Sequence, residues 1–316
     1  MSAESNPDKK YYFFDQSIHN IGFRLRRFSL PGFEGVPMYY VIKFFWRGLQ
    51  KGSLNIRASA IAFNFLLAMG PAIIFLLTLV PYFPIENSHN EILTILRDIM
   101  PENAFLFVES TLEELTVRRG GLQFFGFATA VFFSTKGISA MIASFNATYH
   151  SMESRSYVQQ KLVAIGLVLI FSTLILSSVF LMLFGKLAMN KMLEYGLVQV
   201  NFLYYLIIFL KWIIIILMIF FANSFLYYLA PQRKMKWKFL SPGSSLATIL
   251  FILVSIIFSY FMNNFAQLNR IFGSIGALIA LMIWLNFIAL TLLIGFELNV
   301  SIKNARLNNN ELLELD

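Results

Sequence analysis

A lysine and three hydroxyl side chains lie together in an otherwise apolar segment of the sequence. Within residues 128–150 these are Ser134, Thr135, Lys136 and Ser139. An ammonium beside hydroxyl groups can donate hydrogen bonds to an anionic group. Inside a membrane such a charge is costly unless an anion or water reaches it. The four residues are therefore candidates to contact a phospholipid headgroup or an organic anion in an inward-facing cavity.

The depth of Lys136 separates two interpretations. If residues 122–148 are all immersed, Lys136 lies about 21 Å from the outer end, near the middle of the membrane. If the immersed part ends near Ile142, Lys136 lies about 9 Å deep, and its stem can extend to the cytoplasmic surface. The sequence leaves both interpretations open.

Three more polar residues interrupt apolar segments. Asn64 lies in the first segment, Asn286 near the middle of the last, and Glu297 near the inner end of the last. An amide or carboxylate that faces lipid is costly and usually turns toward neighbouring helices. We expect all three to line the same cavity as Lys136, although a cytoplasmic lysine or arginine could equally satisfy Glu297.

The residues that catalysis or metal binding would require are scarce. The chain has no cysteine, and its three histidines, His19, His89 and His150, are scattered. It contains no P-loop, no HExxH motif and no carboxylate cluster of the kind that two-metal hydrolysis needs. We therefore predict no catalytic residue, no metal, no cofactor and no enzymatic activity. The basic segment 231–238 is interpreted as a belt beside anionic lipids rather than a nucleic-acid site.

Composition indicates the class of protein that must position these residues. Apolar residues make up 58% of the 316 residues and charged residues 13%, against about 45–50% and about 25% in soluble domains. Uninterrupted apolar runs of about 20 residues are long enough to cross a bilayer as helices. The sequence predicts an all-α membrane protein with six spans, at residues 58–82, 122–148, 160–185, 202–229, 242–264 and 274–299.

Basic residues predict the orientation of the chain. Seventeen lysines and arginines flank the spans on the side that holds both termini, and seven lie on or near the other side. Because cationic loops are retained in the cytoplasm, we expect a bacterial inner-membrane protein with both termini cytoplasmic.

Three regions complete the expected domain organisation around a transmembrane domain at residues 38–302. Residues 1–37 are polar and are expected to be disordered, and residues 303–316 form a cytoplasmic tail. Residues 38–52 are expected to form an amphipathic helix on the inner membrane surface. Its apolar and basic positions are Tyr39, Ile42, Phe45, Trp46 and Leu49, and Lys43, Arg47 and Lys51. Residues 88–118 predict short external helices, which could present a surface to an envelope protein partner.

Small residues and one proline predict how helices meet. In the first span, Gly70 and Pro71 predict a kink that sets either packing or a hinge. In the last span, Gly273, Gly276 and Gly295 predict close approach of helix backbones.

Several of these residues are also the ones through which the chain resembles a known family. Residues 40–302 resemble the YihY/BrkB family of bacterial inner-membrane proteins. The most diagnostic matches lie in the C-terminal half, and further matches occur in the first span and in "SFNATYH". The matching positions are Arg57, Ala60, Pro71, Pro231, Pro242, Gly243, Tyr260, Gly273, Gly276, Trp284, Gly295, Glu297 and Asn299. Phe272 and Phe296 depart from the family pattern, and Lys136 has no counterpart in it.

The resemblance implies six helices with both termini cytoplasmic, and it leaves the function open. Members have carried the labels ribonuclease BN and serum-resistance virulence factor. The residues favour a transporter-like protein that handles a lipid, amphiphile or anionic solute in a cavity between its helices. The alternative is a non-transporting scaffold for envelope assembly that uses residues 88–118. Membrane lipids are the expected partners, no nucleic acid is expected, and the oligomeric state is left open.

Overall fold

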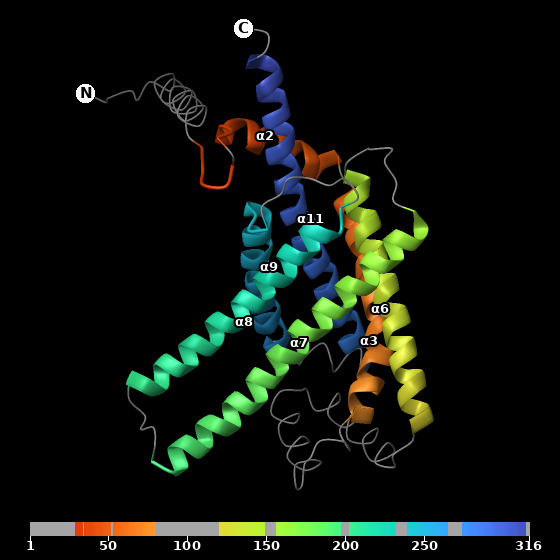
Figure 1. Cartoon of the computed structure of the whole chain (residues 1–316), viewed down its shortest axis with the longest axis vertical. Helices are drawn as coiled ribbons and strands as arrows, with labels where there is room; N and C mark the ends of the chain where they lie inside the picture. The colour runs from red at the N-terminus through yellow and green to blue at the C-terminus, as the bar shows by residue number, and fades with distance from the viewer. Residues whose placement is uncertain are drawn as a thin grey trace, which may run out of the picture.

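The structure is a computed structural model of the whole chain (Figure 1). The residues that it describes are 29–33, 35–51, 53–79, 120–148, 156–196, 202–231, 239–264 and 274–313. The predicted external helices at 88–118, Gly273 and most of the basic segment 231–238 lie outside these residues.

Every secondary-structure element in the described ranges is an α-helix. The helices are α2 (Met38–Lys51), α3 (Leu54–Leu79), α6 (Gly120–Thr148), α7 (Tyr157–Glu194), α8 (Phe202–Leu229), α9 (Pro242–Asn264) and α11 (Ser274–Leu313). Five of them, α6, α7, α8, α9 and α11, are each long and apolar enough to cross a membrane. A sixth span is counted if Met38–Gln50 and Leu54–Pro71, which meet at a bend of 65°, are taken as one. The predicted all-α membrane class is confirmed.

Two helices are longer than the predicted spans. α7 has 38 residues and α11 has 40, where the sequence predicted spans at 160–185 and 274–299. The first part of the predicted tail therefore continues α11 as a helix. α3 runs without interruption through Pro71.

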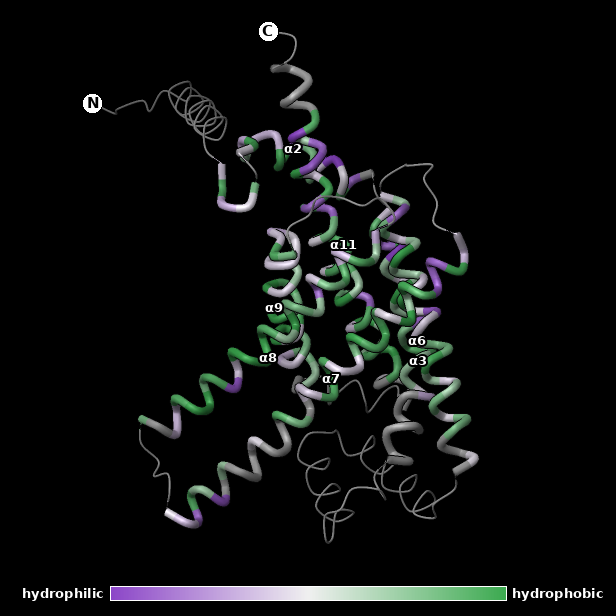
Figure 2. Tube along the Cα trace, viewed as in Figure 1, coloured by the Kyte–Doolittle hydropathy of each residue, from purple (hydrophilic) through white to green (hydrophobic). Residues whose placement is uncertain are grey.

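The described helices pack in pairs, and α11 belongs to several of these pairs. α3 packs along α6, and α11 packs against both α3 and α9. α7 joins α6 to α8, and α8 in turn packs against α9. In Figure 1 the lower ends of α7 and α8 diverge from the lower ends of α3 and α6. Figure 2 shows hydrophilic residues gathered toward the end that carries α2, whereas α8 and α9 are largely hydrophobic.

The amphipathic helix α2 packs across the C-terminal part of α11. Val41 is buried in a small core with Ile302 and Ala305 of α11. Ile42 and Trp46 are exposed, as are Lys43 and Arg47. The exposed apolar and basic residues agree with a position at a membrane surface. Val41 was not among the predicted apolar positions of this helix. Its burial depends on contacts with α11, a segment far away in the sequence.

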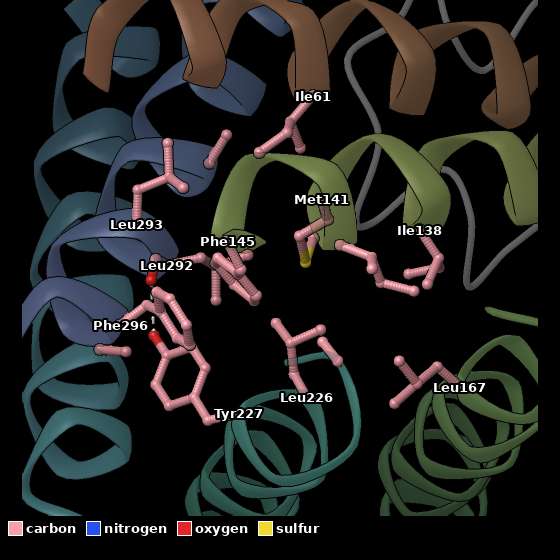
Figure 3. Packing of buried hydrophobic residues seen from close by; sticks show 14 of the residues in the cluster. Ile61, Ile138, Met141, Phe145, Leu167, Leu226, Tyr227, Leu292, Leu293 and Phe296 are labelled. Atoms are coloured by element: carbon pink, nitrogen blue, oxygen red, sulfur yellow. Dashed lines mark hydrogen bonds between the residues drawn. The ribbon is translucent and has the colours of Figure 1, made fainter. Parts of the chain in front are cut away.

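Three aromatic rings form the centre of the main core at the junction of α6, α8 and α11 (Figure 3). Phe145 and Phe296 are stacked with ring centroids 4.1 Å apart, and Tyr227 meets Phe145 edge to face at 5.7 Å. The Tyr227 hydroxyl donates a hydrogen bond of 2.7 Å to the Leu292 carbonyl oxygen. Glu297, which directly follows Phe296 in the sequence, lies at the same end of the bundle as this junction.

Candidate functional site

Arg57 is the cation that reaches into this end of the bundle. It lies in the first turn of α3, and its Nη1 donates hydrogen bonds to the Ser144 carbonyl oxygen at 3.0 Å and to Thr148 Oγ1 at 2.9 Å. Both acceptors lie in the last turns of α6, so the guanidinium ties the ends of two helices together. Its Nε and Nη2 are buried and have no hydrogen-bond partner among the described residues.

Glu297 brings an acid to the same region from α11. Its side chain is 5% exposed, so the expectation that it turns toward neighbouring helices is correct. The carboxylate packs directly against α2, because a Cβ added at Gly48 would lie 2.5 Å from Glu297 Cδ. Glycine at position 48 is therefore the residue that leaves room for the carboxylate.

Arg57 and Glu297 interact electrostatically. Among the described residues, however, no ion pair within 4.0 Å joins them. A cation and an anion in a poorly solvated region attract one another strongly even at a distance. The two residues therefore form a separated charge pair in which the guanidinium still has donors to offer. We refer to Arg57, Glu297, Ser144 and Thr148 as the inner polar site.

A second polar cluster fixes α9 against α11 beside this site. Asn299 Oδ1 accepts a hydrogen bond of 2.8 Å from the Gly243 backbone N–H, and its Nδ2 donates one of 2.9 Å to Ser241 Oγ. The backbones of Gly243 and Gly295 are in close contact. All groups of this cluster are buried and mutually satisfied, which is typical of a packing element. Gly295 was predicted to allow close approach of helices, and in the structure its backbone lies against that of Gly243.

The predicted cavity residues on α6 are not gathered with Glu297. Lys136 is exposed, and its Nζ lies 4.7 Å from the Phe132 ring centroid and 5.9 Å from that of Phe133. Both rings precede Lys136 on the helix, so the ammonium points toward the N-terminal end of α6 rather than toward the end that carries α2. The neighbouring hydroxyls bond within the helix: Thr135 to the Val131 carbonyl and Ser139 to the Thr135 carbonyl. Ser134 is partly exposed.

The two predicted asparagines lie at different helix contacts: Asn286 lies where α11 meets α3, whereas the backbone of Asn64 on α3 lies beside Gly137 of α6. Asn286 Nδ2 donates a hydrogen bond of 2.8 Å to Ser59 Oγ, which links the two helices. Asn64 donates to the Ala60 carbonyl oxygen of its own helix. Neither asparagine side chain makes a described hydrogen bond to the predicted polar residues of α6.

Gly276 and Gly70, which were also predicted to set helix packing, have different surroundings in the structure. Gly276 is buried, as close approach of helices requires. At Gly70, by contrast, no described atom lies within 4 Å of an added Cβ, so this glycine brings no described helix close.

Arg57 is the charged residue of the inner polar site that was not predicted as a site residue from the sequence. Its position at the start of an apolar segment is typical of a flanking charge, and it contributed only to the orientation and to the family resemblance. Its inward direction depends on acceptors 87 and 91 positions further along the chain. A helix-phase argument could have helped, because Arg57 shares a face of α3 with the buried residue Ile61, four positions later.

These features define a multi-pass α-helical membrane protein with a charged site at one end of its bundle. Residues 45–314 match the family model described as virulence factor BrkB. Because this match covers most of the chain, the protein belongs to the BrkB family, and the predicted resemblance is confirmed.

Individual relatives agree with this assignment. The chain is 33% identical over 250 residues to the putative ribonuclease-like protein YfkH of Bacillus subtilis strain 168, covering 77% of this chain and 88% of the relative. It is 21% identical over 279 residues to a UPF0761 membrane protein of Psychromonas ingrahamii, covering 84% and 88%. It is 22% identical over 260 residues to one of Haemophilus influenzae, covering 80% and 91%. No solved structure matches the chain.

Proposed function

We propose that the protein is a transporter-like membrane protein that binds the anionic group of a lipid, amphiphile or solute at the inner polar site. The observation that carries the proposal is the Arg57 guanidinium, whose buried Nε and Nη2 have no partner among the described residues. A buried donor without a partner costs about 1–3 kcal/mol. A carboxylate or phosphate offers two oxygens in the geometry that a guanidinium fork binds.

Glu297 has a defined part in this proposal. Its charge balances Arg57 when no anion is bound, and its carboxylate packs against Gly48 of α2. An arriving anion competes with Glu297 for the same guanidinium. Such competition favours exchange over tight retention, which suits a protein that must release what it binds.

The proposal also specifies where the site faces and what the protein does not do. We place the protein in the bacterial inner membrane with both termini in the cytoplasm, so the inner polar site opens toward the cytoplasmic side. The positive charge of the flanking segments supports this orientation. The ribonuclease-like name of the Bacillus subtilis relative is not carried over, because the chain has no cysteine and only three scattered histidines. We propose that it is not an enzyme.

Anion binding can be tested on the purified full-length protein. Its thermal unfolding midpoint would be measured against increasing dioctanoyl phosphatidic acid and, separately, inorganic phosphate, so that a lipid and a free anion are distinguished. Arg57→Gln is expected to weaken the binding of whichever anion raises the wild-type midpoint by about tenfold or more, since one charged hydrogen-bonding group is lost. Glu297→Gln is expected to bind at least as tightly as the wild type, because the competing charge is removed.

Arg47→Gln is the matched control, because Arg47 is exposed on α2 and should leave the response unchanged. The binding part of the proposal fails if neither anion raises the wild-type midpoint, or if Arg57→Gln responds as the wild type does. The transport part is tested in proteoliposomes with fluorescent phosphatidic acid and external dithionite. Transfer between leaflets should occur with the wild type and be lost with Arg57→Gln.

A further inference from the structure

The seam between α6 and α7 carries two lysines on the outer surface of the bundle. Lys161 lies in the second turn of α7, and its Nζ donates a hydrogen bond of 3.4 Å to Ser139 Oγ on α6. Lys136 is exposed one helical turn before Ser139 on α6. Residues three apart on a helix are neighbours on its surface. Lys136, Ser139 and Lys161 therefore lie along one strip of the surface, which we call the outer seam; the Lys161 ammonium contacts the hydroxyl, and the Lys136 ammonium lies over the Phe132 ring.

The outer seam has an excess of positive charge. The described contacts of Lys136 are the rings of Phe132 and Phe133, and those of Lys161 are Ser139 and the Tyr157 ring at 5.5 Å. Within the described part of the chain, neither lysine forms an ion pair with a carboxylate. Each ammonium has three donors, so most of this capacity is open to a group from outside the chain.

The surface on both sides of the seam is apolar. Phe132 on α6 and Leu162 and Ile165 on α7 are all exposed. In a membrane protein these side chains face the acyl chains of lipids. A soluble anion would be matched by the lysines alone, whereas a phospholipid is matched by the lysines at its headgroup and by these residues along its chains.

The position of the seam along α6 can be compared with that of the inner polar site. Ser144, which Arg57 contacts, marks the level of the inner polar site on α6. Ser139 lies five residues before it, or about 7.5 Å along the axis. Lys136 lies deeper still, but its exposed four-carbon stem is free to turn toward Ser139.

From these observations we infer that the outer seam is a binding site for an anionic phospholipid, with its phosphate held between Lys161, Ser139 and Lys136. This site is separate from the inner polar site, which faces α3 and α11, and it does not depend on the proposed transport role. It would hold a resident lipid against the α6 and α7 helices.

The test compares three probes on the purified full-length protein: dioctanoyl phosphatidylglycerol, dioctanoyl phosphatidylcholine and inorganic phosphate. Phosphatidylglycerol should raise the thermal unfolding midpoint at lower concentration than the other two. Lys161→Met and Lys136→Met should each weaken phosphatidylglycerol binding about fivefold, since one lysine near anionic lipid contributes about 1 kcal/mol. Lys161→Arg keeps the charge and should retain the response.

Two controls separate this site from the rest of the molecule. Lys211→Met removes a lysine of α8 whose Nζ lies 5.9 Å from the Trp212 ring, and it should leave phosphatidylglycerol binding unchanged. The comparison is repeated in an Arg57→Gln background, which removes the inner polar site; phosphatidylglycerol should still be preferred there, and Lys161→Met should still weaken it. The inference is overturned if the Arg57→Gln protein shows no preference over phosphatidylcholine, if phosphate alone reproduces the effect, or if neither lysine substitution weakens it. If a lysine variant does not fold, the preference of the Arg57→Gln protein decides the matter.

Discussion

Tyr227 and Tyr228 are adjacent in α8 but have opposite surroundings. Tyr227 is 2% exposed, meets Phe145 edge to face in the aromatic centre and donates a hydrogen bond to the Leu292 carbonyl oxygen, whereas Tyr228 is 54% exposed. We predict that Tyr227→Phe lowers the free energy of unfolding by about 1 kcal/mol, because one buried hydrogen bond is lost while the ring remains. The thermal midpoint of the purified variant measures this loss. Tyr228→Phe is the matched control and should leave it unchanged; equal midpoints for the two variants would contradict the assignment.

The sequence could predict one half of the inner polar site but not the other. Glu297 stands out because it is an acid inside an apolar segment, and its burial follows from the cost of facing lipid. Arg57 does not stand out, because an arginine at the start of a span has a cytoplasmic explanation. Its partners Ser144 and Thr148 come from another helix. The pairing of distant segments is not visible in a single sequence.

For Lys136 the limit of prediction from the sequence is a different one. The sequence identifies it as an unusual charge but does not give the direction in which it points. The phase of α6 is set by the buried residues Ile138, Met141 and Phe145. This phase turns Lys136 outward, away from Glu297. An anion contact remains the prediction for this lysine, whose side chain lies on the exposed surface of α6.

At the scale of elements, the crossing of α9 and α11 is a close contact between helix backbones. A Cβ added at Gly243 would lie 2.5 Å from Asn299 Cγ and would also collide with the Gly295 backbone oxygen. A backbone oxygen in a helix cannot move aside as a flexible side chain can. The two helices would have to separate, which would also strain the hydrogen bonds of Asn299 to Gly243 and Ser241.

We therefore predict that Gly243→Ala destabilises the protein by about 1–3 kcal/mol through overpacking. The thermal midpoint of the purified variant and its yield in the membrane fraction measure the effect. Gly166→Ala is the matched control, because no described atom lies within 4 Å of a Cβ at that position in α7. There the better helix propensity of alanine should leave stability unchanged or slightly raised. An unimpaired Gly243→Ala protein would show that the crossing is looser than described.

Helix existence was easier to predict than helix extent. Long apolar runs indicate spans because the bilayer requires backbone hydrogen bonds to close within each helix. The predicted spans at 202–229 and 242–264 nearly coincide with α8 and α9. α7 and α11 continue beyond the predicted spans because polar residues can extend a helix outside the apolar layer. For α11 the extension is also packed by α2 through Val41 and Ile302.

At the scale of the whole molecule, α2 and the C-terminal part of α11 lie at one end of the bundle, and the end of α7 lies at the other (Figure 1). From the distribution of basic residues we propose that the first of these ends lies in the cytoplasm. The absence of cysteine from the whole sequence makes this orientation measurable, because a single introduced cysteine is the only thiol that a maleimide can label.

We predict opposite accessibility for two exposed positions, Tyr195 after α7 and Leu307 in α11. In intact spheroplasts, a membrane-impermeant maleimide should label Tyr195→Cys and leave Leu307→Cys unlabelled, since the bilayer separates the reagent from the cytoplasmic end. After lysis both variants should be labelled, which controls for the reactivity of each thiol. Labelling of Leu307→Cys alone in spheroplasts would reverse the orientation, and the inner polar site would then face the periplasm. Labelling of both before lysis would place the two ends on the same side, which an odd number of spans between them does not permit.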